Sequence, residues 1–167
     1  MSNRMWIKTR ETDGLSLGEI MSKKYKTQWS GQFGVAHELT RRGYLVTFTI
    51  GNAPAADLLC ESPSGKVFSV QVKSLSSKTY FLYQSALVEP DASRFFVFVL
   101  IPDAVDQRPE YFVLDNQQFR QVVTEQEQVS RELEEKRGKP YGKFSPGINY
   151  KILARHDFLD AWGNIPQ

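Results

Sequence analysis

The chain has 167 residues and is poor in the residue types that build several common kinds of site. Its single cysteine, Cys60, excludes a disulfide within the chain and a metal cage of thiolates. Its two histidines, His37 and His156, lie far apart and lack the spacing of metal ligands, which disfavours a zinc enzyme. The sequence has no nucleophile-elbow motif that would support Ser-His-Asp hydrolysis.

The chain also lacks a long hydrophobic run. No uninterrupted apolar stretch reaches the roughly 20 residues that cross a bilayer, so no membrane partner is expected. Residues 1–10 are polar and lack the apolar segment of a secretory signal. The formal net charge of +2 neither requires nor excludes nucleic acid. Together these features predict a soluble, cytoplasmic protein.

The length of the chain fits one domain. Residues 1–26 are polar and basic, and we expect them to form an N-terminal arm with a short helix at 15–21. The domain itself is expected over residues 27–167. Its first element is a helix over 27–42, which Gly43 ends. Four apolar residues at helical spacing predict the buried face of this helix: Trp29, Phe33, Ala36 and Leu39.

Strands follow the first helix. Residues 44–50 are rich in β-branched and aromatic side chains and predict a strand. Residues 57–61 and 66–74 predict two more, and the Pro/Gly turn at 62–65 would join these two into a hairpin. Residues 94–101 form an apolar run without alternation, which is typical of a strand buried on both faces.

The second half of the chain predicts further helices and strands. A short strand is expected at 111–114, followed by a helix that Asp115 or Asn116 caps. The charged segment 125–136 indicates an exposed or protruding helix. Two more elements are candidates only: an edge strand at 150–153 and a terminal helix at 156–162. This order predicts an α/β fold with a mixed sheet flanked by helices.

Three polar residues of the hairpin indicate a site. Asp57 begins one strand, and Gln71 and Lys73 lie two apart on the other, so their side chains project to the same face. Pairing of the strands would place the Asp57 carboxylate beside the other two. Oxygen ligands of this kind bind Mg²⁺, and a lysine can orient the attacking water and neutralise charge during phosphodiester hydrolysis.

These residues resemble the signature of the PD-(D/E)XK nuclease superfamily. Asp57 stands as its aspartate, and Gln71-Val-Lys73 stands in place of (D/E)-x-K. The similarity extends over roughly residues 27–163 and includes a resemblance to a bacterial group with a D…QxK variant. It implies a restriction-endonuclease-like fold and a Mg²⁺-dependent endonuclease, with Mn²⁺ as a substitute, that cuts DNA. A homodimer is one arrangement that would bring a site to each strand.

The resemblance also implies a ligand from the first helix. We assign Gln32 to this role, because it lies on the sheet-facing side with Leu39 and occupies the place where the superfamily has glutamate. Glu38 is predicted instead to form a solvated ion pair with Arg41 and Arg42. Asp57 would then be the only side-chain carboxylate on the metal, with Gln71 as a second metal ligand.

Other interpretations of the same residues stay open. Asp57 can be a turn residue bonded to local backbone, and Lys73 an edge-strand lysine. Gln71 and Gln32 can be surface amides. The whole fold can be a weak or inactive nuclease module that binds nucleic acid or a protein partner. Four lysines are candidates for contacts with DNA phosphates, although charge runs are also typical of a solvated surface: Lys23, Lys24, Lys26 and Lys78.

Overall fold

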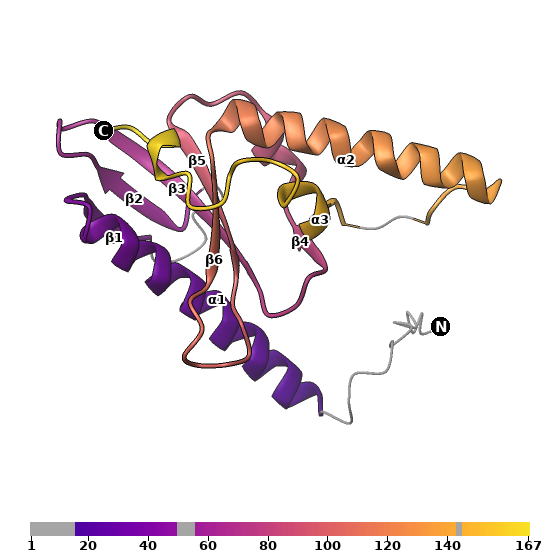
Figure 1. Ribbon diagram of the computed structural model, residues 1–167, viewed down its shortest axis with the longest axis horizontal. Helices are drawn as coiled ribbons and strands as arrows, with labels where there is room; N and C mark the ends of the chain where they lie inside the picture. The colour runs from indigo at the N-terminus through magenta and orange to yellow at the C-terminus, as the bar shows by residue number, and fades with distance from the viewer. Residues whose placement is uncertain (1–15, 50–55, 143–144) are drawn as a thin grey trace, which may run out of the picture.

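A five-stranded sheet with the strand order β1-β2-β3-β5-β6 forms the centre of the structure (Figure 1). The computed structural model describes residues 16–49, 56–142 and 145–167. The strands of this sheet are β1 Leu45–Phe48, β2 Leu58–Glu61, β3 Val67–Leu75, β5 Arg94–Leu100 and β6 Glu110–Leu114. β3 and β5 pair in parallel, and the other neighbouring strands are antiparallel. The predicted mixed sheet is therefore confirmed.

The predicted hairpin between residues 57–61 and 66–74 is confirmed as β2 and β3. The Ser62 backbone N–H donates to the Lys66 carbonyl at 2.9 Å, and the Gly65 N–H donates to the Ser62 carbonyl at 2.8 Å. Gly65 has a φ of 85°, a conformation that glycine adopts without steric cost. This turn fixes which residues of β2 and β3 lie opposite one another.

The first helix, α1 Leu17–Thr40, begins earlier than predicted. Ser16 and Glu19 form a capping box, in which each side chain accepts a hydrogen bond from the backbone N–H of the other. Residues 17–26 are therefore helical, which confirms the short helix expected at 15–21 for its described part and joins it to the first helix. Residues 1–15 of the predicted arm lie outside the described residues. Gly43, with a φ of 90°, follows the helix as predicted.

Helices cover both faces of the sheet (Figure 1). The core on the α1 side includes Val35, Leu39, Phe68, Val70, Val97 and Val113. The core on the other side lies under α2 and α3 and includes Phe96, Phe98, Leu114, Phe119, Val122 and Leu153. β5 contributes side chains to both cores, which confirms that the strand predicted at 94–101 is buried on both faces.

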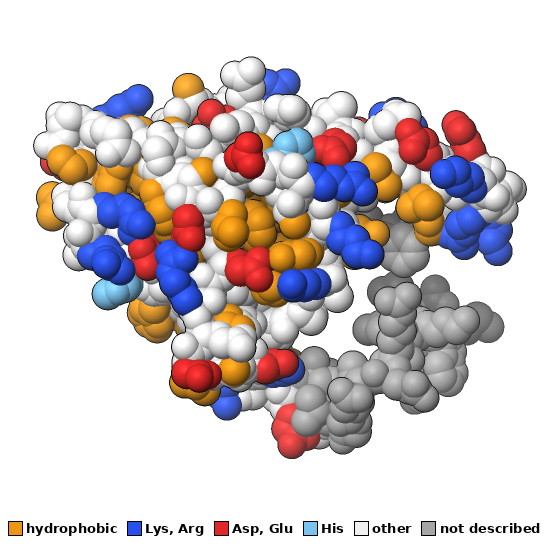
Figure 2. Space-filling model, viewed as in Figure 1, with side chains coloured by type: hydrophobic (Ala, Val, Ile, Leu, Met, Phe, Trp, Pro, Cys, Tyr) orange, Lys and Arg blue, Asp and Glu red, His pale blue; other side chains and the backbone are white. Residues whose placement is uncertain are grey.

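The helix α2 Asn116–Arg137 is continuous, and its charged second half projects past the sheet (Figure 1). Asp115 caps it, with its carboxylate accepting a hydrogen bond from the Gln118 N–H at 2.7 Å. Basic and acidic side chains are mixed at the projecting end in Figure 2. The predicted exposed helix over 125–136 is thus confirmed. Among the described residues, no helix combines the length and the apolar composition needed to span a membrane.

A second, two-stranded sheet of β4 Tyr80–Leu82 and β7 Gly147–Asn149 extends the core on the α2 side. The predicted edge strand at 150–153 is wrong, because these residues form the short helix α3 Tyr150–Leu153. The side chain of Asn149 accepts a hydrogen bond from the Lys151 N–H at 2.9 Å and so starts a helix where a strand was expected.

The predicted terminal helix at 156–162 is also wrong. The backbone here bonds to β6: Val113 N–H donates to the Phe158 carbonyl at 2.9 Å, and Asp160 N–H donates to the Tyr111 carbonyl at 2.7 Å. Only the 3₁₀ turn η2 Trp162–Asn164 follows. Phe158 and Trp162 are buried as expected, whereas Leu159, also expected to pack inward, is exposed.

The face that α1 turns to the sheet differs from the prediction. Leu39 and Ala36 are buried, but Trp29 and Phe33 are largely exposed. Gly31 lies at the sheet instead, and a Cβ there would sit 1.8 Å from the Ser74 hydroxyl oxygen. Because α1 approaches the sheet at Gly31, the aromatic residues on its flank remain in solvent.

Glu38 is buried, with 7% of its side chain exposed, so the prediction that its ion pair is solvated is wrong. It does bind Arg42, and Arg41 and Arg108 lie at 3.8 and 3.6 Å from its other oxygen. Arg108 also makes two hydrogen bonds to Asp160, at 2.6 and 2.9 Å. This charge cluster joins the end of α1 to the C-terminal segment that lies along β6.

Glu38→Gln is expected to lower the free energy of unfolding by about 1.5–3 kcal/mol near neutral pH, because a buried carboxylate loses its arginine partners. Burial raises the pKa of Glu38, but the Arg42 hydrogen bond and the neighbouring arginine charges outweigh this and hold the pKa below its ordinary value of 4.5. The loss should therefore be complete above about pH 4.5 and shrink as the pH falls through the lower native pKa.

Urea unfolding of wild type and Glu38→Gln from about pH 3 to about pH 7 measures this difference, because carboxylates titrate within this range. Glu127→Gln is the matched control, because Glu127 is exposed on α2. A difference between wild type and Glu38→Gln that stays constant with pH would contradict the stabilising role of the charge.

Candidate functional site

Asp57 stands where β2 stops pairing with β3. The last paired residues are Leu58 and Val70, and the Asp57 N–H still donates to the Val70 carbonyl at 3.0 Å. The Asp57 carboxylate then accepts a hydrogen bond from the Val72 N–H at 2.8 Å. The Asp57 carboxylate thus accepts the hydrogen bond from Val72 that a backbone carbonyl of a paired strand would otherwise accept. Because sheet donors point along the sheet, the carboxylate lies near the sheet's own plane, between its two faces.

Gln71 lies opposite Asp57 and donates its side-chain N–H to the same carboxylate oxygen that accepts from Val72. It is buried, with 6% exposed. Successive residues of β3 alternate between the faces, and Val70 and Val72 belong to the core on the α1 side. Gln71 therefore extends toward the α2 side, as does Lys73, two residues further on.

Gln32 reaches the same carboxylate from α1. Its Nε2 donates to Asp57 Oδ1 at 2.9 Å, and its side chain is buried. The approach depends on Gly31, since any larger residue would meet Ser74. Of the two helix candidates, the structure brings Gln32 to Asp57 and places Glu38 in the separate arginine cluster. Two amides thus bind one carboxylate from the two sides of the sheet.

The electrostatics of Asp57 follow from this setting. Burial raises the pKa of Asp57 above its ordinary value of 3.8. The hydrogen bond from Val72, the charge of Lys73 and the hydrogen bond from Gln32 act in the other direction and offset part of the effect. The groups around Asp57 therefore do not fully offset the effect of its burial. A nearby cation would favour its ionised form.

The donor set fits a hard divalent cation. In the described parts of the chain, no group of three or more His, Cys, Asp or Glu side chains could hold a metal. Asp57 supplies one carboxylate, and a half-turn of each side-chain amide would exchange the nitrogen of Gln32 or Gln71 for its oxygen. Mg²⁺ accepts one carboxylate with neutral oxygens and completes its shell with water and phosphate oxygens. These residues are suited to Mg²⁺ or Mn²⁺ and not to a soft metal.

The four lysines named from the sequence do not form one group. Lys23, Lys24 and Lys26 are exposed on the half of α1 that extends past the sheet. Lys78 lies in the bend between β3 and β4, with its Nζ 4.9 Å from the centre of the Tyr150 ring. The structure thus provides a basic stretch on α1 and a separate lysine at the other side of the sheet.

Thr49 supports the site and was missed in the sequence. Its N–H donates to the Asp57 carbonyl at 3.1 Å, and its hydroxyl donates to the Ala56 carbonyl at 2.6 Å. These bonds hold the backbone of Asp57 beside the end of β1. No local pattern marked Thr49, because its role depends on a partner that the chain brings back only after residues 50–55.

The fold and site define an α/β protein with a mixed sheet flanked by helices and a polar cluster where β2 leaves β3. Comparison with protein-family models, curated proteins and solved structures gives no match to this chain. Its function is therefore inferred from the chemistry of the site alone.

Two substitutions of Asp57 should differ in stability. Asp57→Asn keeps a planar group that can bond Val72 and the two amides, so we expect it to be at least as stable as wild type at neutral pH. Asp57→Ala leaves the buried Val72 N–H without its acceptor and should cost about 1–3 kcal/mol. Because the native pKa of Asp57 is raised, wild type should lose stability relative to Asp57→Asn as the pH rises from 3.8 through that pKa.

Thermal unfolding of wild type, Asp57→Asn and Asp57→Ala over this pH range measures their order of stability. Equal destabilisation by both substitutions would contradict the bonding described for Asp57. A pH-independent difference between wild type and Asp57→Asn would contradict the raised pKa.

Proposed function

We propose that this protein is a Mg²⁺-dependent nuclease of the restriction-endonuclease-like type that hydrolyses phosphodiester bonds in DNA. The observation that supports this function best is the convergence of Gln32 and Gln71, from separate segments, on the part-buried carboxylate of Asp57. The carboxylate accepts from both amides, one at each of its two oxygens. Two buried amides and a neighbouring lysine add the oxygen ligands and positive charge that phosphodiester hydrolysis uses.

Each residue has a role in this proposal. Asp57 would hold the cation through its carboxylate, and Gln71 and Gln32 would supply neutral oxygens. When bound, the metal would acidify a water molecule and neutralise charge on the phosphate. Lys73 orients the attacking water and adds positive charge near the scissile phosphate. Burial raises the pKa of Asp57, and a bound cation would favour its ionised form and so lower that pKa again.

A second function has its own supporting observation. Three donors already occupy the Asp57 carboxylate, and both amides are turned to donate to it. This arrangement is self-sufficient and would stabilise a nuclease fold that binds nucleic acid, or a protein partner, without cutting. Metal binding separates the two functions, because the binding module has no need for a cation at Asp57.

The nuclease proposal predicts that the purified protein nicks or cuts DNA with Mg²⁺ or Mn²⁺. Asp57→Ala and Lys73→Ala should each lower the cleavage rate by at least about 100-fold, because they remove a ligand and a charge that acts on the transition state. Gel assays on supercoiled plasmid and on single-stranded circles measure nicking and cutting of both substrate types.

The controls for this assay come from exposed residues outside the site. Asp103→Ala and Lys66→Ala remove the same charges from the surface and should cut like wild type. Equal cleavage by wild type, Asp57→Ala and Lys73→Ala would identify a contaminating nuclease. Sedimentation of the active protein on DNA would show whether two copies act together.

Gln71→Glu tests the metal site without relying on activity. A second carboxylate beside Asp57 should lower the melting temperature in metal-free buffer, because two buried like charges repel. Added Mn²⁺ should reverse this loss and bind at least about tenfold more tightly than to wild type. Calorimetry and thermal unfolding with and without Mn²⁺ measure both effects.

Gln121→Glu, on the exposed surface of α2, is the matched control and should change neither quantity. If Mn²⁺ binds neither wild type nor Gln71→Glu, the metal site is rejected. The metal-independent binding module then becomes the supported function.

A further inference from the structure

An exposed apolar ridge runs along α1 toward the site. Its four residues are spaced by four positions and so lie in one row: Met21, Tyr25, Trp29 and Phe33. Their exposed fractions are 52%, 58%, 46% and 56%. Single exposed apolar residues are common, but a continuous row of four on one helix is a surface that can bind a partner.

The aromatic end of the ridge is ordered. The Trp29 and Phe33 rings stack with centres 5.3 Å apart and an interplanar angle of 25°. Phe48, at the end of β1, packs edge-on against Phe33 at 5.3 Å and lies 6.4 Å from the Trp29 ring. The rings therefore hold fixed orientations while half of their surface stays in solvent. Such a platform can stack on a flat ring with little loss of side-chain entropy.

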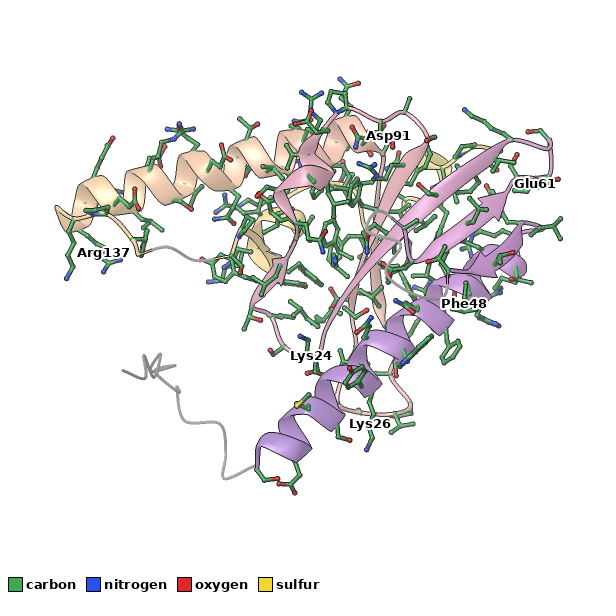
Figure 3. All side chains as sticks on the ribbon, turned by 180° about the vertical axis from the view of Figure 1, so that it is seen from behind. Lys24, Lys26, Phe48, Glu61, Asp91 and Arg137 are labelled. Carbon is green, nitrogen blue, oxygen red and sulfur yellow. The ribbon has the colours of Figure 1, made fainter. Side chains whose placement is uncertain are left out.

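Lysines of α1 flank the ridge. Lys24 and Lys26 precede and follow Tyr25, so each is turned about 100° from it around the helix. Figure 3 shows these two lysines on opposite sides of α1. The chain has no Asp or Glu between Glu19 and Glu38. A ligand that combines flat apolar rings with a negatively charged backbone is complementary to this surface.

Two of these aromatic residues are neighbours in sequence of residues that bind Asp57. Phe33 directly follows Gln32, whose amide binds Asp57. Phe48 directly precedes Thr49, whose N–H binds the Asp57 carbonyl at 3.1 Å. The aromatic end of the ridge is thus adjacent in sequence to two residues that bind Asp57.

We infer that the ridge binds single-stranded DNA, with bases stacked on Trp29 and Phe33 and phosphates bound by Lys24 and Lys26. In a duplex the base faces are covered by neighbouring bases, so only an unpaired strand offers them to the platform. The inference names the substrate class of the proposed nuclease and rests on that function for its catalytic part. The binding itself needs no metal.

Fluorescence anisotropy with labelled oligonucleotides of about a dozen nucleotides tests the binding in metal-free buffer. Wild type should bind the single strand more tightly than the matching duplex. Trp29→Ala and Phe33→Ala should each weaken single-strand binding by roughly 5- to 150-fold, and Trp29→Phe, which keeps a ring, should restore most of it. Leu133→Ala removes an exposed apolar residue of α2 and should bind like wild type.

The lysines have a distinct signature in the same assay. Lys24→Ala and Lys26→Ala should each reduce the dependence of log Kd on log salt by about 0.7, the value for one phosphate contact on a single strand. Lys136→Ala, at the exposed end of α2, is the matched control and should leave the salt dependence unchanged.

Several results would overturn the inference. Equal binding by wild type, Trp29→Ala and Phe33→Ala would do so, as would a preference for the duplex. A wild-type dimer that Trp29→Ala dissociates in sedimentation, without an effect on DNA binding, would make the ridge a contact between copies of this chain.

The inference and the nuclease proposal can fail separately. Asp57→Ala should lose cleavage but bind the single strand like wild type. Ridge-dependent binding without cleavage under any metal would reject the nuclease and keep the ridge. Cleavage by wild type together with single-strand binding that Trp29→Ala leaves unchanged would reject the ridge and keep the nuclease.

Discussion

The structure of the site depends on one hydrogen bond, from the Val72 N–H of β3 to the carboxylate of Asp57 at 2.8 Å. β2 ends its pairing at Val70, so the next donor of β3 lacks a strand partner on that side. A buried N–H without an acceptor costs about 1–3 kcal/mol, and a carboxylate at the end of β2 removes that cost. The same bond holds a charge between the two faces of the sheet, where residues from both sides can reach it.

Three parts of α1 have different roles in the structure. Its C-terminal part packs in the core through Val35 and Leu39, and its middle brings Gln32 to Asp57. The part before Gly31 extends past the sheet and keeps Trp29 in solvent. The change occurs at Gly31, where the helix touches Ser74 closely enough that a Cβ would clash. A single long helix therefore couples an exposed surface to a buried site without an intervening hinge.

The fold was predicted well where the signal was local. Residues 57–61 and 66–74 alternate around a Pro/Gly turn, and hairpin register follows from such short-range chemistry. Segment 94–101 was recognised as buried because its length and composition leave no polar face. Prediction failed at 150–153 and 156–162, where Asn149 starts a helix and β6 offers its backbone to the C-terminal segment. Those outcomes depend on partners distant in sequence.

The sequence by itself determined the strand hairpin, the α/β order and the pairing of Asp57 with Gln71, because residue alternation and turn chemistry act over a few positions. Only the tertiary structure decided that Glu38 is buried among arginines and that Phe33 stays exposed. Helical periodicity gives the relative angles of side chains but not which angle faces the sheet. That angle is set where the backbone can approach most closely, at Gly31 beside Ser74.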